Sequence, residues 1–422
     1  MISSAKPSVP EPFYSNASFY RFVPLSLAYT LVAHFASLLM KPFPCRLSIA
    51  PEFPQDRFTI APRNNLFPAA NDNNQGPLAI VTGSNSGIGF ETSASLASLG
   101  YTVILACRSR DKAMEAVEKI NKRIESMSDQ GSARGKAVFL APLDLSSIES
   151  VKSFSEAFKE KYSHLNVLVN NAGINTSGVS VDGMDLCYQT NFLGHFLLTR
   201  LLLKSLLKAK NFYASGDDVE AGRVVNLSSV THHFSGCNEA RNGGQYFNSS
   251  RKHDKKWWND TSVPGVSDNT YKESKLAALV FSHALNKRFN TEGLVSVAAN
   301  PGSVDSSIWR HYPPLMQKIH KLIYINEKQG SYTSVASAVG RLPENVLYLQ
   351  PYWQPFRTLK SKIKDRTRAL GFGKRFNVPI PFCEMLGPFI GYAVTEPRLP
   401  FDLDESAKDL WDSSSELVGL EK

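Results

Sequence analysis

The chain has 422 residues, of which 42% are hydrophobic and 20% are charged, the balance of a globular protein that can bury a large core. Its formal net charge of +9 would suit a nucleic acid or an anionic membrane surface. The sequence contains no basic helix interleaved with aromatic residues, no zinc-finger spacing and no repeat. We therefore predict no nucleic-acid partner, and we interpret the positive charge as a solvated surface that also suits a phosphate-rich cofactor.

The cysteines are scattered and contain no C-x-x-C pair, which argues against a disulfide framework and against a metal site. They are Cys45, Cys107, Cys187, Cys237 and Cys383. We expect thiols in a reducing compartment, with Cys107 and Cys187 buried as small apolar side chains. No metal ligand set is predicted.

Residues 1–76 are rich in Pro, Asn, Ser and Phe and are predicted to be a targeting or membrane-anchor segment with a linker. Within them, Val23 to Met40 ("VPLSLAYTLVAHFASLLM") has about the length needed to cross a bilayer. Three interpretations stay open: a signal-anchor helix, an organelle-targeting segment and an amphipathic surface helix. We expect membrane association through residues 23–40, at the endoplasmic reticulum or, alternatively, at a mitochondrion or plastid.

From Pro77 onward, short apolar runs alternate with segments of helical period. In chain order, strands are predicted over 78–83, 101–108, 135–146, 165–173, 222–229 and 294–302. Helices are predicted over 87–100, 111–127, 147–162 and 191–208, and a further helix starts near Tyr271. The helix over 111–127 places Met114, Val117, Ile120 and Ile124 on one face.

Near-continuous apolar strands that alternate with helices indicate a parallel sheet covered on both faces. The predicted fold is therefore α/β: a doubly wound, Rossmann-like, three-layer sandwich over residues 77–422, without a second domain. Two long insertions are expected in it, at about 230–268, before the helix at Tyr271, and at about 309–382. Loops of that length in a compact domain are typical of substrate covers or of disorder.

The first strand is followed by "TGSNSGIG", with Gly83, Gly87 and Gly89 in the spacing G-x-x-x-G-x-G. Glycine permits positive φ and lets the backbone approach a pyrophosphate, while the new helix directs its N–H groups at the anion. Between a strand and a helix, this pattern predicts a dinucleotide-binding turn.

The second strand ends in "ACRSR", with Arg108 and Arg110 and without an acid at its tip. A carboxylate there would accept a hydrogen bond from the ribose 2′-hydroxyl of NAD, whereas an arginine can bind the 2′-phosphate of NADP. Arg108 therefore predicts NADP as the cofactor.

Seven motifs occur in order: "TGSNSGIG", "DL" at 144–145, "NNAG" at 170–173, "NFLGHFLLT", "VVNLSS", "YKESK" and "NPGSV". Together they resemble the short-chain dehydrogenase/reductase superfamily of classical type. "LACR", "LGHFLLT" and "LWDSSSELVG" are similar to its retinol-dehydrogenase-like branch. The resemblance covers about residues 77–310 well, and the tail from about Leu399 loosely.

The resemblance implies a catalytic set and a cofactor set. The catalytic set is Asn191, Ser229, Tyr271 and Lys275. The cofactor set is Gly83, Ser84, Ser86, Gly87, Ile88, Gly89, Arg108, Asp144, Leu145, Asn171, Ala172, Gly173, Tyr271, Lys275, Pro301, Gly302 and Val304.

Physical chemistry supports these roles. Tyr271 and Lys275 lie four residues apart and so share one helix face. A phenol of pKa near ~10 holds its proton too tightly at neutral pH, and a nearby ammonium favours the phenolate. Ser229 can donate a hydrogen bond to the substrate oxygen, and Asn191 is expected to hold a water that relays protons to Lys275.

Alternatives remain for two of these positions, Asn191 and Ser229. Asn191 could instead be a helix N-cap, and the family register chooses Ser229 over Ser228. A nucleophile-and-base pair of Ser229 with His232 or His233 is disfavoured because no G-x-S-x-G elbow is present.

The sequence predicts an NADP(H)-dependent oxidoreductase that interconverts an alcohol and a carbonyl on a small lipophilic substrate. The alternative is an NADP-binding scaffold or sensor with vestigial catalysis. Candidate substrates are retinoids, steroids, other lipophilic carbonyls and, less in keeping with the branch, a tetrapyrrole. The two insertions prevent the substrate from being carried over from relatives, and a homo-oligomer is compatible with the family.

Overall fold

The computed structural model describes residues 76–126, 135–212, 221–234, 270–306, 324–340, 347–351, 392–395 and 402–421, and three single residues, 308, 317 and 342. The predicted anchor at 23–40 and most of the two predicted insertions lie outside these residues. Within the described ranges, no helix combines the length and the apolar character needed to span a bilayer. The domain boundary near residue 76 stays a prediction.

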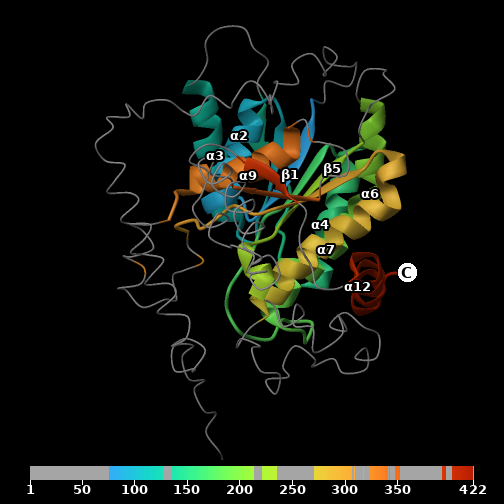
Figure 1. The fold of residues 1–422 in the computed structure, drawn as a ribbon. Helices are drawn as coiled ribbons and strands as arrows, with labels where there is room; N and C mark the ends of the chain where they lie inside the picture. Colours follow the sequence, from blue (N-terminus) through green and yellow to red (C-terminus); the bar gives the residue numbers. More distant parts are fainter. Residues whose placement is uncertain are drawn as a thin grey trace, which may run out of the picture. The chain divides into compact units, whose positions relative to one another are not determined.

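An eight-stranded sheet forms the centre of the domain, in the order β3-β2-β1-β4-β5-β6-β7-β8 (Figure 1). All neighbouring strands pair in parallel except β8, which is antiparallel to β7. The strands are β1 (Leu78–Thr82), β2 (Thr102–Ala106), β3 (Lys136–Val138), β4 (Val167–Asn170), β5 (Arg223–Leu227), β6 (Val295–Ala299), β7 (Tyr348–Pro351) and β8 (Tyr392–Thr395). The predicted doubly wound parallel sheet is therefore confirmed.

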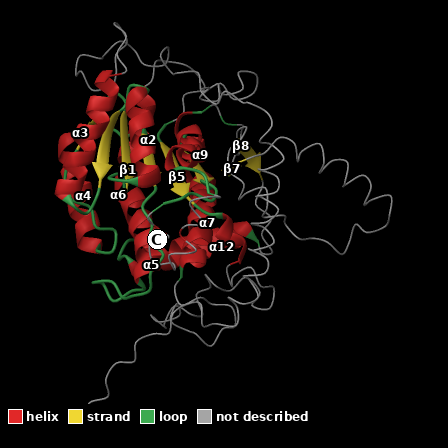
Figure 2. Cartoon of the chain, turned by 90° about the vertical axis from the view of Figure 1, so that its left-hand side faces the viewer, coloured by secondary structure: helices red, strands yellow, loops and turns green. Residues whose placement is uncertain are grey.

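Helices cover both faces of this sheet, as the views in Figures 1 and 2 show. One face carries α2 (Gly87–Ser98), α3 (Arg110–Ser126) and α9 (Glu327–Val339). The opposite face carries α4 (Ile148–Lys161), α6 (Gly194–Lys208) and α7 (Tyr271–Phe289), with α12 (Leu403–Leu417) packed on α7. Because both faces are covered, every residue of β1 and of β5 is buried, which explains their near-continuous apolar sequences.

The buried face of α3 consists of alanines and isoleucines. Met114 is 47% exposed, and the residues that are buried are Ala113, Ala116, Ile120 and Ile124. Small alanines let α3 approach the sheet closely, so the face is rotated away from the larger methionine. The predicted helix is confirmed as α3; of its periodic apolar residues, Ile120 and Ile124 are buried and Met114 is exposed.

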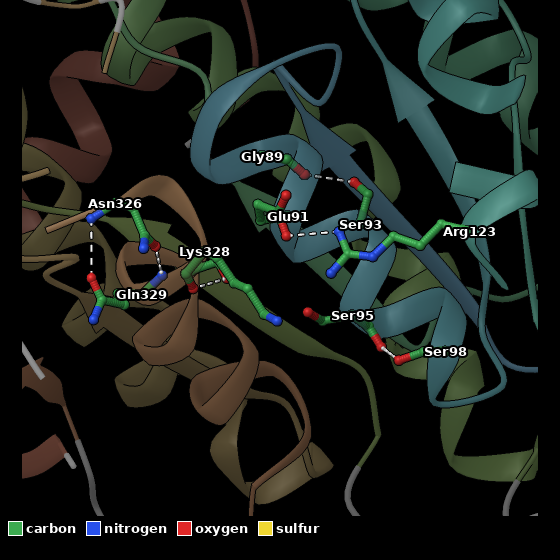
Figure 3. Close-up of polar contacts among 10 residues, drawn as sticks. Gly89, Glu91, Ser93, Ser95, Ser98, Arg123, Asn326, Lys328 and Gln329 are labelled. Carbon is green, nitrogen blue, oxygen red and sulfur yellow. Dashed lines mark hydrogen bonds and ion pairs between the residues drawn. The ribbon is translucent and has the colours of Figure 1, made fainter. Parts of the chain in front are cut away.

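Part of the predicted insertion at 309–382 belongs to the domain itself. Helix α9 begins with a capping box in which Asn326 and Gln329 exchange hydrogen bonds of 2.8 and 3.1 Å (Figure 3). It packs against α2, where Glu91 forms a 3.0 Å ion pair with Arg123 of α3 (Figure 3). Strand β7 then joins the sheet beside β6. Helix α9 and strand β7 thus lie within the range predicted as an insertion, and the bounds of that insertion stay a prediction.

The strand order reverses between β1 and β4, because the chain leaves β1 for β2 and β3 on one side and continues to β4 and β5 on the other. In open α/β sheets, ligands bind at such a switch point, beyond the carboxyl ends of the strands. The predicted site residues follow the carboxyl ends of β1, β2, β4, β5 and β6. The fold thus brings segments far apart in the sequence to one edge of the sheet.

Candidate active site

The glycine turn joins β1 to α2. Gly83 and Gly87 both have φ of +65°, a conformation that side-chain-bearing residues rarely adopt. A β-carbon at Gly89 would lie 2.4 Å from the Asn171 side-chain nitrogen, so the helix can approach the next strand only with glycine there. Ser86 is the N-cap of α2, but its side chain makes no capping hydrogen bond. The first N–H groups of α2 are thus not capped by Ser86, as a pyrophosphate site requires.

Thr82, the last residue of β1, holds the glycine turn against the NNAG turn after β4. Its hydroxyl oxygen accepts hydrogen bonds of 2.9 Å from the backbone N–H groups of Asn171 and Ala172. The Asn171 side chain donates back to the Thr82 carbonyl across 2.7 Å. The two predicted cofactor-binding turns are therefore one hydrogen-bonded unit, although the sequence analysis did not single out Thr82.

Arg108 lies exposed just beyond β2. Within the part of the chain that the structure describes, no hydrogen bond or ion pair of Arg108 is observed. The neighbouring Arg110 has its guanidinium 5.8 Å from the centre of the Phe139 ring. Cys107 is buried, as predicted, and its sulfur lies 3.4 Å from the Ser84 hydroxyl. The role of Arg108 at the end of β2 stays a prediction.

Asp144 and Leu145, the predicted cofactor residues after β3, make local contacts. Asp144 accepts hydrogen bonds of 3.0 and 2.6 Å from the N–H and hydroxyl of Ser146. A β-carbon at Gly194 would lie 2.4 Å from the Leu145 carbonyl, so α6 starts directly against this segment. The contacts fix the backbone of Asp144 and Leu145 at the edge of the sheet.

The segment after β6 forms the other side of the site. Gly302 donates its N–H to the Asn300 side chain across 3.0 Å in the turn that contains Pro301. Val304 pairs with Ile325 in an isolated bridge. A β-carbon at Gly330 of α9 would lie 2.5 Å from Val304 and 3.5 Å from Ile88. Val304 and Ile88, both predicted cofactor residues, therefore meet across the start of α9.

Lys275 is the buried cation of the site. It is 5% exposed, and its ammonium donates a 3.0 Å hydrogen bond to the Leu227 carbonyl at the end of β5. The same ammonium lies 5.5 Å from the centre of the Tyr271 ring. Burial lowers the pKa of Lys275 from 10.5 to about 8. At neutral pH the ammonium is thus still charged and lies beside the phenol.

The two serines after β5 have different environments. Ser228 is buried, and its hydroxyl donates a 2.8 Å hydrogen bond to the Lys275 backbone carbonyl. Ser229 is half-buried, and its oxygen accepts the Thr231 N–H across 3.3 Å. Since Ser229 accepts in that bond, its own hydrogen can be donated to a ligand. The choice of Ser229 over Ser228 as the catalytic serine stays a prediction.

The imidazole of His232 contacts the Ser229 backbone. Its Nδ1 lies 2.6 Å from the Ser229 carbonyl oxygen, and its ring packs edge-on against Tyr348 with centroids 5.3 Å apart. His232 therefore does not form the nucleophile-and-base pair considered from the sequence. The side chain of His233 lies outside the described residues.

Asn191 lies inside a continuous helical segment, in the π-turn η3 (Gln189–Leu193) between the short helix α5 (Leu186–Tyr188) and α6. Its side-chain oxygen accepts the Ile174 N–H at 2.8 Å, and its nitrogen donates to the Ile174 carbonyl at 3.0 Å and to Ser274 Oγ at 3.1 Å. Asn191 is therefore not an N-cap. A β-carbon at Gly173 would lie 3.5 Å from both Asn191 Oδ1 and Lys275 Nζ.

His195 connects Asn191 to the glycine turn. Its Nε2 lies 2.8 Å from the Thr82 hydroxyl oxygen, and its Nδ1 lies 3.0 Å from the Asn191 carbonyl oxygen. The Thr82 hydroxyl can donate to Nε2 or to the Val169 carbonyl, 3.4 Å away, and the Asn191 carbonyl oxygen can only accept. Nδ1 must then carry the imidazole hydrogen and donate it to Asn191. Complete burial lowers the pKa of His195 from 6.5 to about 4 and keeps it neutral.

Comparison with known proteins identifies the family of this chain. Residues 77–240 match the family model described as short chain dehydrogenase. Retinol dehydrogenase 11 of Mus musculus is 33% identical over 269 residues, which cover 63% of this chain and 73% of that protein. The chain belongs to the short-chain dehydrogenase family. Retinol dehydrogenase 12 of Homo sapiens, 32% identical over 321 residues that cover 74% of this chain and 87% of that protein, places it in the retinol-dehydrogenase-like branch.

Among solved structures, an uncharacterized protein from Mycobacterium paratuberculosis superposes with a TM-score of 0.51 at 23% identity, over 85% of this chain and 97% of that one. This likeness agrees with the Rossmann-like fold. As a member of the short-chain dehydrogenase family, the protein is an oxidoreductase that acts on CH–OH donors with NAD(P) as acceptor.

In this short-chain dehydrogenase, four polar residues that the sequence analysis left unassigned lie among the predicted site residues: Thr82, Asp185, His195 and Thr270. Two of them are in or beside motifs, since Thr82 opens "TGSNSGIG" and His195 lies in "NFLGHF". A rule that examines polar residues within an apolar motif would have singled these two out. Asp185 and Thr270 carry no such signal.

Proposed function

We propose that the protein is an NADP(H)-dependent oxidoreductase that interconverts an alcohol and a carbonyl on a lipophilic substrate, with Tyr271 as acid and base. The observation that carries the proposal is the pair of hydrogen bonds between β5 and α7. Ser228 binds the Lys275 backbone, and Lys275 binds the Leu227 carbonyl. These bonds fix the serine turn, which ends in Ser229, against the helix that begins at Tyr271.

The cofactor-binding residues fit a dinucleotide on three counts. The start of α2 has no side-chain cap, the glycine turn is too crowded for larger residues, and Arg108 is exposed at the end of β2. When bound, the nicotinamide would supply or accept the hydride. Gly83, Gly87 and Gly89 would hold its phosphates, and Arg108 would bind a 2′-phosphate and thereby favour NADP.

Proton transfer in the reduction direction is then assigned to this chain's own side chains. As charge develops on the carbonyl oxygen, the Tyr271 hydroxyl donates its proton, and the Ser229 hydroxyl donates a hydrogen bond to the same oxygen. The Lys275 ammonium, 5.5 Å from the Tyr271 ring centre, stabilises the phenolate that remains. In oxidation, the phenolate takes the proton from the alcohol, and the same two groups act in reverse.

The role of Asn191 in this proposal is to hold the helix segment. Its side-chain amide is bonded to the Ile174 backbone in both directions and to Ser274. A water relay through Asn191 to Lys275 remains a prediction, and one accepting site on Oδ1 is left for such a water.

A lipophilic substrate is inferred from the relatives. The curated relatives include several proteins named retinol dehydrogenase, and retinol is an apolar alcohol. Membrane association through residues 23–40 is proposed from the length and apolar character of that segment, and residence at the endoplasmic reticulum and a homo-oligomeric state stay predictions. Imaging a tagged full-length chain beside one that starts at Gly76 tests the location: loss of membrane localisation in the short chain is expected.

The function is tested by following NADPH consumption with a panel of apolar aldehydes and ketones, including retinal and steroids, and NADP⁺ reduction with the matching alcohols. We expect turnover with at least one apolar pair and a loss of about 10²–10⁴-fold in Tyr271→Phe. Normal turnover in Tyr271→Phe would contradict the catalytic role of Tyr271. NADPH binding without turnover across the whole panel would instead favour the scaffold with vestigial catalysis.

A further inference from the structure

Asp185 is a buried carboxylate that the proposed mechanism does not use. It is 5% exposed and precedes α5, at the end of the loop that follows the NNAG turn. Its Oδ1 accepts a 2.7 Å hydrogen bond from the Tyr188 N–H, which makes it the N-cap of α5. The same Oδ1 accepts a 2.5 Å hydrogen bond from the Thr270 hydroxyl, 85 positions further along the chain. Asp185 Oδ1 therefore accepts hydrogen bonds from residues at the start of two helices, α5 and α7.

Thr270 is the partner that makes this contact unusual. It is 1% exposed and occupies the N-cap position of α7, directly before Tyr271. A threonine at an N-cap normally accepts a hydrogen bond from its own helix, which stabilises the helix start. In this protein the Thr270 side chain makes no such bond. Its hydroxyl is turned toward Asp185 instead, so local capping of α7 is replaced by a contact between two helices.

A second contact joins the same two segments on the other side of Tyr271. The Asn191 amide donates to Ser274 Oγ across 3.1 Å, and the Ser274 hydroxyl donates to the Tyr271 carbonyl across 2.7 Å. Asp185 and Asn191 belong to one helical segment, which runs from α5 through η3 into α6. Two links, at Thr270 and at Ser274, therefore hold the first turn of α7 against that segment.

We propose that Asp185 is a positioning residue that acts through Thr270 to fix Tyr271 at the reacting oxygen. This inference rests on the proposed function, because it needs Tyr271 to transfer a proton. Holding a catalytic group in a near-attack position is a large part of enzymatic rate, and a displacement of about 1 Å can cost about 10²-fold. Loss of the link should therefore lower kcat while the distant binding surfaces are unchanged.

A purely structural cap predicts a different result. If Asp185 only capped α5, removal of the Thr270 hydroxyl would be irrelevant to Asp185, and any effect would appear as lost stability. Asn and Asp are about equally good N-caps, and an amide oxygen can also accept the Thr270 hydroxyl. The experiment should therefore compare two kinds of variant. One kind keeps the accepting oxygen at position 185 or the hydroxyl at position 270, and the other kind removes that group.

The experiment uses the full chain, NADPH and the carbonyl that the wild type reduces best. Thr270→Val removes the hydroxyl at nearly constant volume, and Thr270→Ser keeps it. We expect kcat to fall by about 10- to 100-fold in Thr270→Val, with KM and the dissociation constant of NADPH within about twofold of the wild type. Thr270→Ser should recover most of kcat.

Asp185 is varied in the same way. Asp185→Asn should keep most of kcat, whereas Asp185→Ala should resemble Thr270→Val. Because both changes remove one link, the double variant Asp185→Ala/Thr270→Val should be no slower than the slower single variant. Asp402→Ala is the matched control, since Asp402 caps α12 through the N–H groups of Asp404 and Glu405. It should lower the unfolding midpoint and leave kcat unchanged.

The outcomes separate the inference from the function on which it rests. A wild type that turns over substrate, together with unchanged kcat in Thr270→Val, overturns the positioning role alone. Multiplicative kinetic losses in the double variant, or equal losses in Thr270→Ser and Thr270→Val, also overturn it. A wild type that binds NADPH and reduces nothing overturns the proposed function and the positioning role together.

Discussion

The Lys275 ammonium donates a 3.0 Å hydrogen bond to the backbone carbonyl of Leu227, the last residue of β5. In return, Ser228 donates to the Lys275 carbonyl across 2.8 Å. The strand end and the helix α7 are thus bonded in both directions at the point where the charge is buried. A flexible lysine side chain becomes a fixed cation beside Tyr271, at the cost of removing that cation from water.

The first prediction concerns pH. Burial lowers the pKa of Lys275 to about 8, so the ammonium is present below that pH and is lost above it. Because the ammonium stabilises the Tyr271 phenolate, kcat/KM for carbonyl reduction should fall as pH rises through about 8. The measurement is a pH profile from 6 to 10 with the wild type and with Lys275→Met. The variant should be slower by about 10²–10⁴-fold and should lack this descending limb; a limb that persists contradicts the assignment to Lys275.

Lys275 should increase activity but lower the stability of the fold. Lys275 titrates near 10.5 when unfolded and at about 8 when folded, so between these values the unfolded chain holds more protons. The unfolding free energy therefore rises with pH across that window. The shift corresponds to about 3 kcal/mol, less about 1 kcal/mol for the lost bond to Leu227. Lys275→Met should thus be more stable than the wild type by about 2 kcal/mol at pH 7 in urea unfolding, with no gain near pH 10.5.

The adjacent serines give a pair of opposite effects. Ser229→Ala should lower kcat by about 10²-fold, because it removes a hydrogen-bond donor to the developing charge, and it should hardly change stability. Ser228→Ala should destabilise the fold by about 1 kcal/mol, because it removes a buried bond to the Lys275 carbonyl. Urea unfolding and steady-state kinetics on both variants test this. The family register would be wrong if Ser228→Ala were the slower enzyme and Ser229→Ala the less stable protein.

The sheet could be predicted from the sequence because its strands are buried on both faces. "LAIVT" and "RVVNL" carry apolar residues almost without interruption, and a doubly covered parallel sheet is the structure that buries such runs. Helix α9 could not be predicted in the same way. Its buried face consists mainly of small and hydroxyl-bearing residues, and Val335 and Val339 are its only large aliphatic members, so the apolar period that marks it is weak. Strand β7 is short and ends in Pro351.

The site residues also fall into two groups, those that the sequence predicts and those that it does not. Tyr271 and Lys275 are one helical turn apart, and the glycines lie in a single turn, so local spacing reveals them. The residues that hold them are joined over long separations: Thr82 to His195 across 113 positions and Asp185 to Thr270 across 85. A contact between residues so far apart leaves no periodic pattern in the local sequence. Only the strand order of the sheet brings these residues together.

Cofactor choice is tested at the end of β2. Arg108 and Arg110 are both exposed, and the Arg110 guanidinium also lies 5.8 Å from the centre of the Phe139 ring. A charge-assisted hydrogen bond contributes about 1.5–3 kcal/mol, so Arg108→Ala should weaken NADPH binding by about 10- to 100-fold and leave NADH binding within about threefold. Arg108→Asp should reverse the preference, because its carboxylate repels a 2′-phosphate. Arg110→Ala is the matched control and should leave the NADPH-to-NADH ratio unchanged; the proposal for Arg108 fails if the two alanine variants behave alike. Fluorescence titration of the wild type and the three variants with NADPH and with NADH measures the eight dissociation constants.

The buried imidazole of His195 leads to a prediction about acid stability. Desolvation, together with the Lys275 charge, lowers its pKa from 6.5 to about 4. Between those values the unfolded chain binds a proton that the folded chain does not, so the unfolding free energy should fall as pH falls from 6.5 to 4, by up to about 3 kcal/mol. His195→Gln carries no titratable group, although its amide can still donate to the Asn191 carbonyl. Urea unfolding at several pH values should therefore show a flatter acid slope in His195→Gln than in the wild type. An equal slope in the two proteins would mean that His195 gains its proton without cost, and the neutral Nδ1–H form that links Thr82 to Asn191 would have to be abandoned.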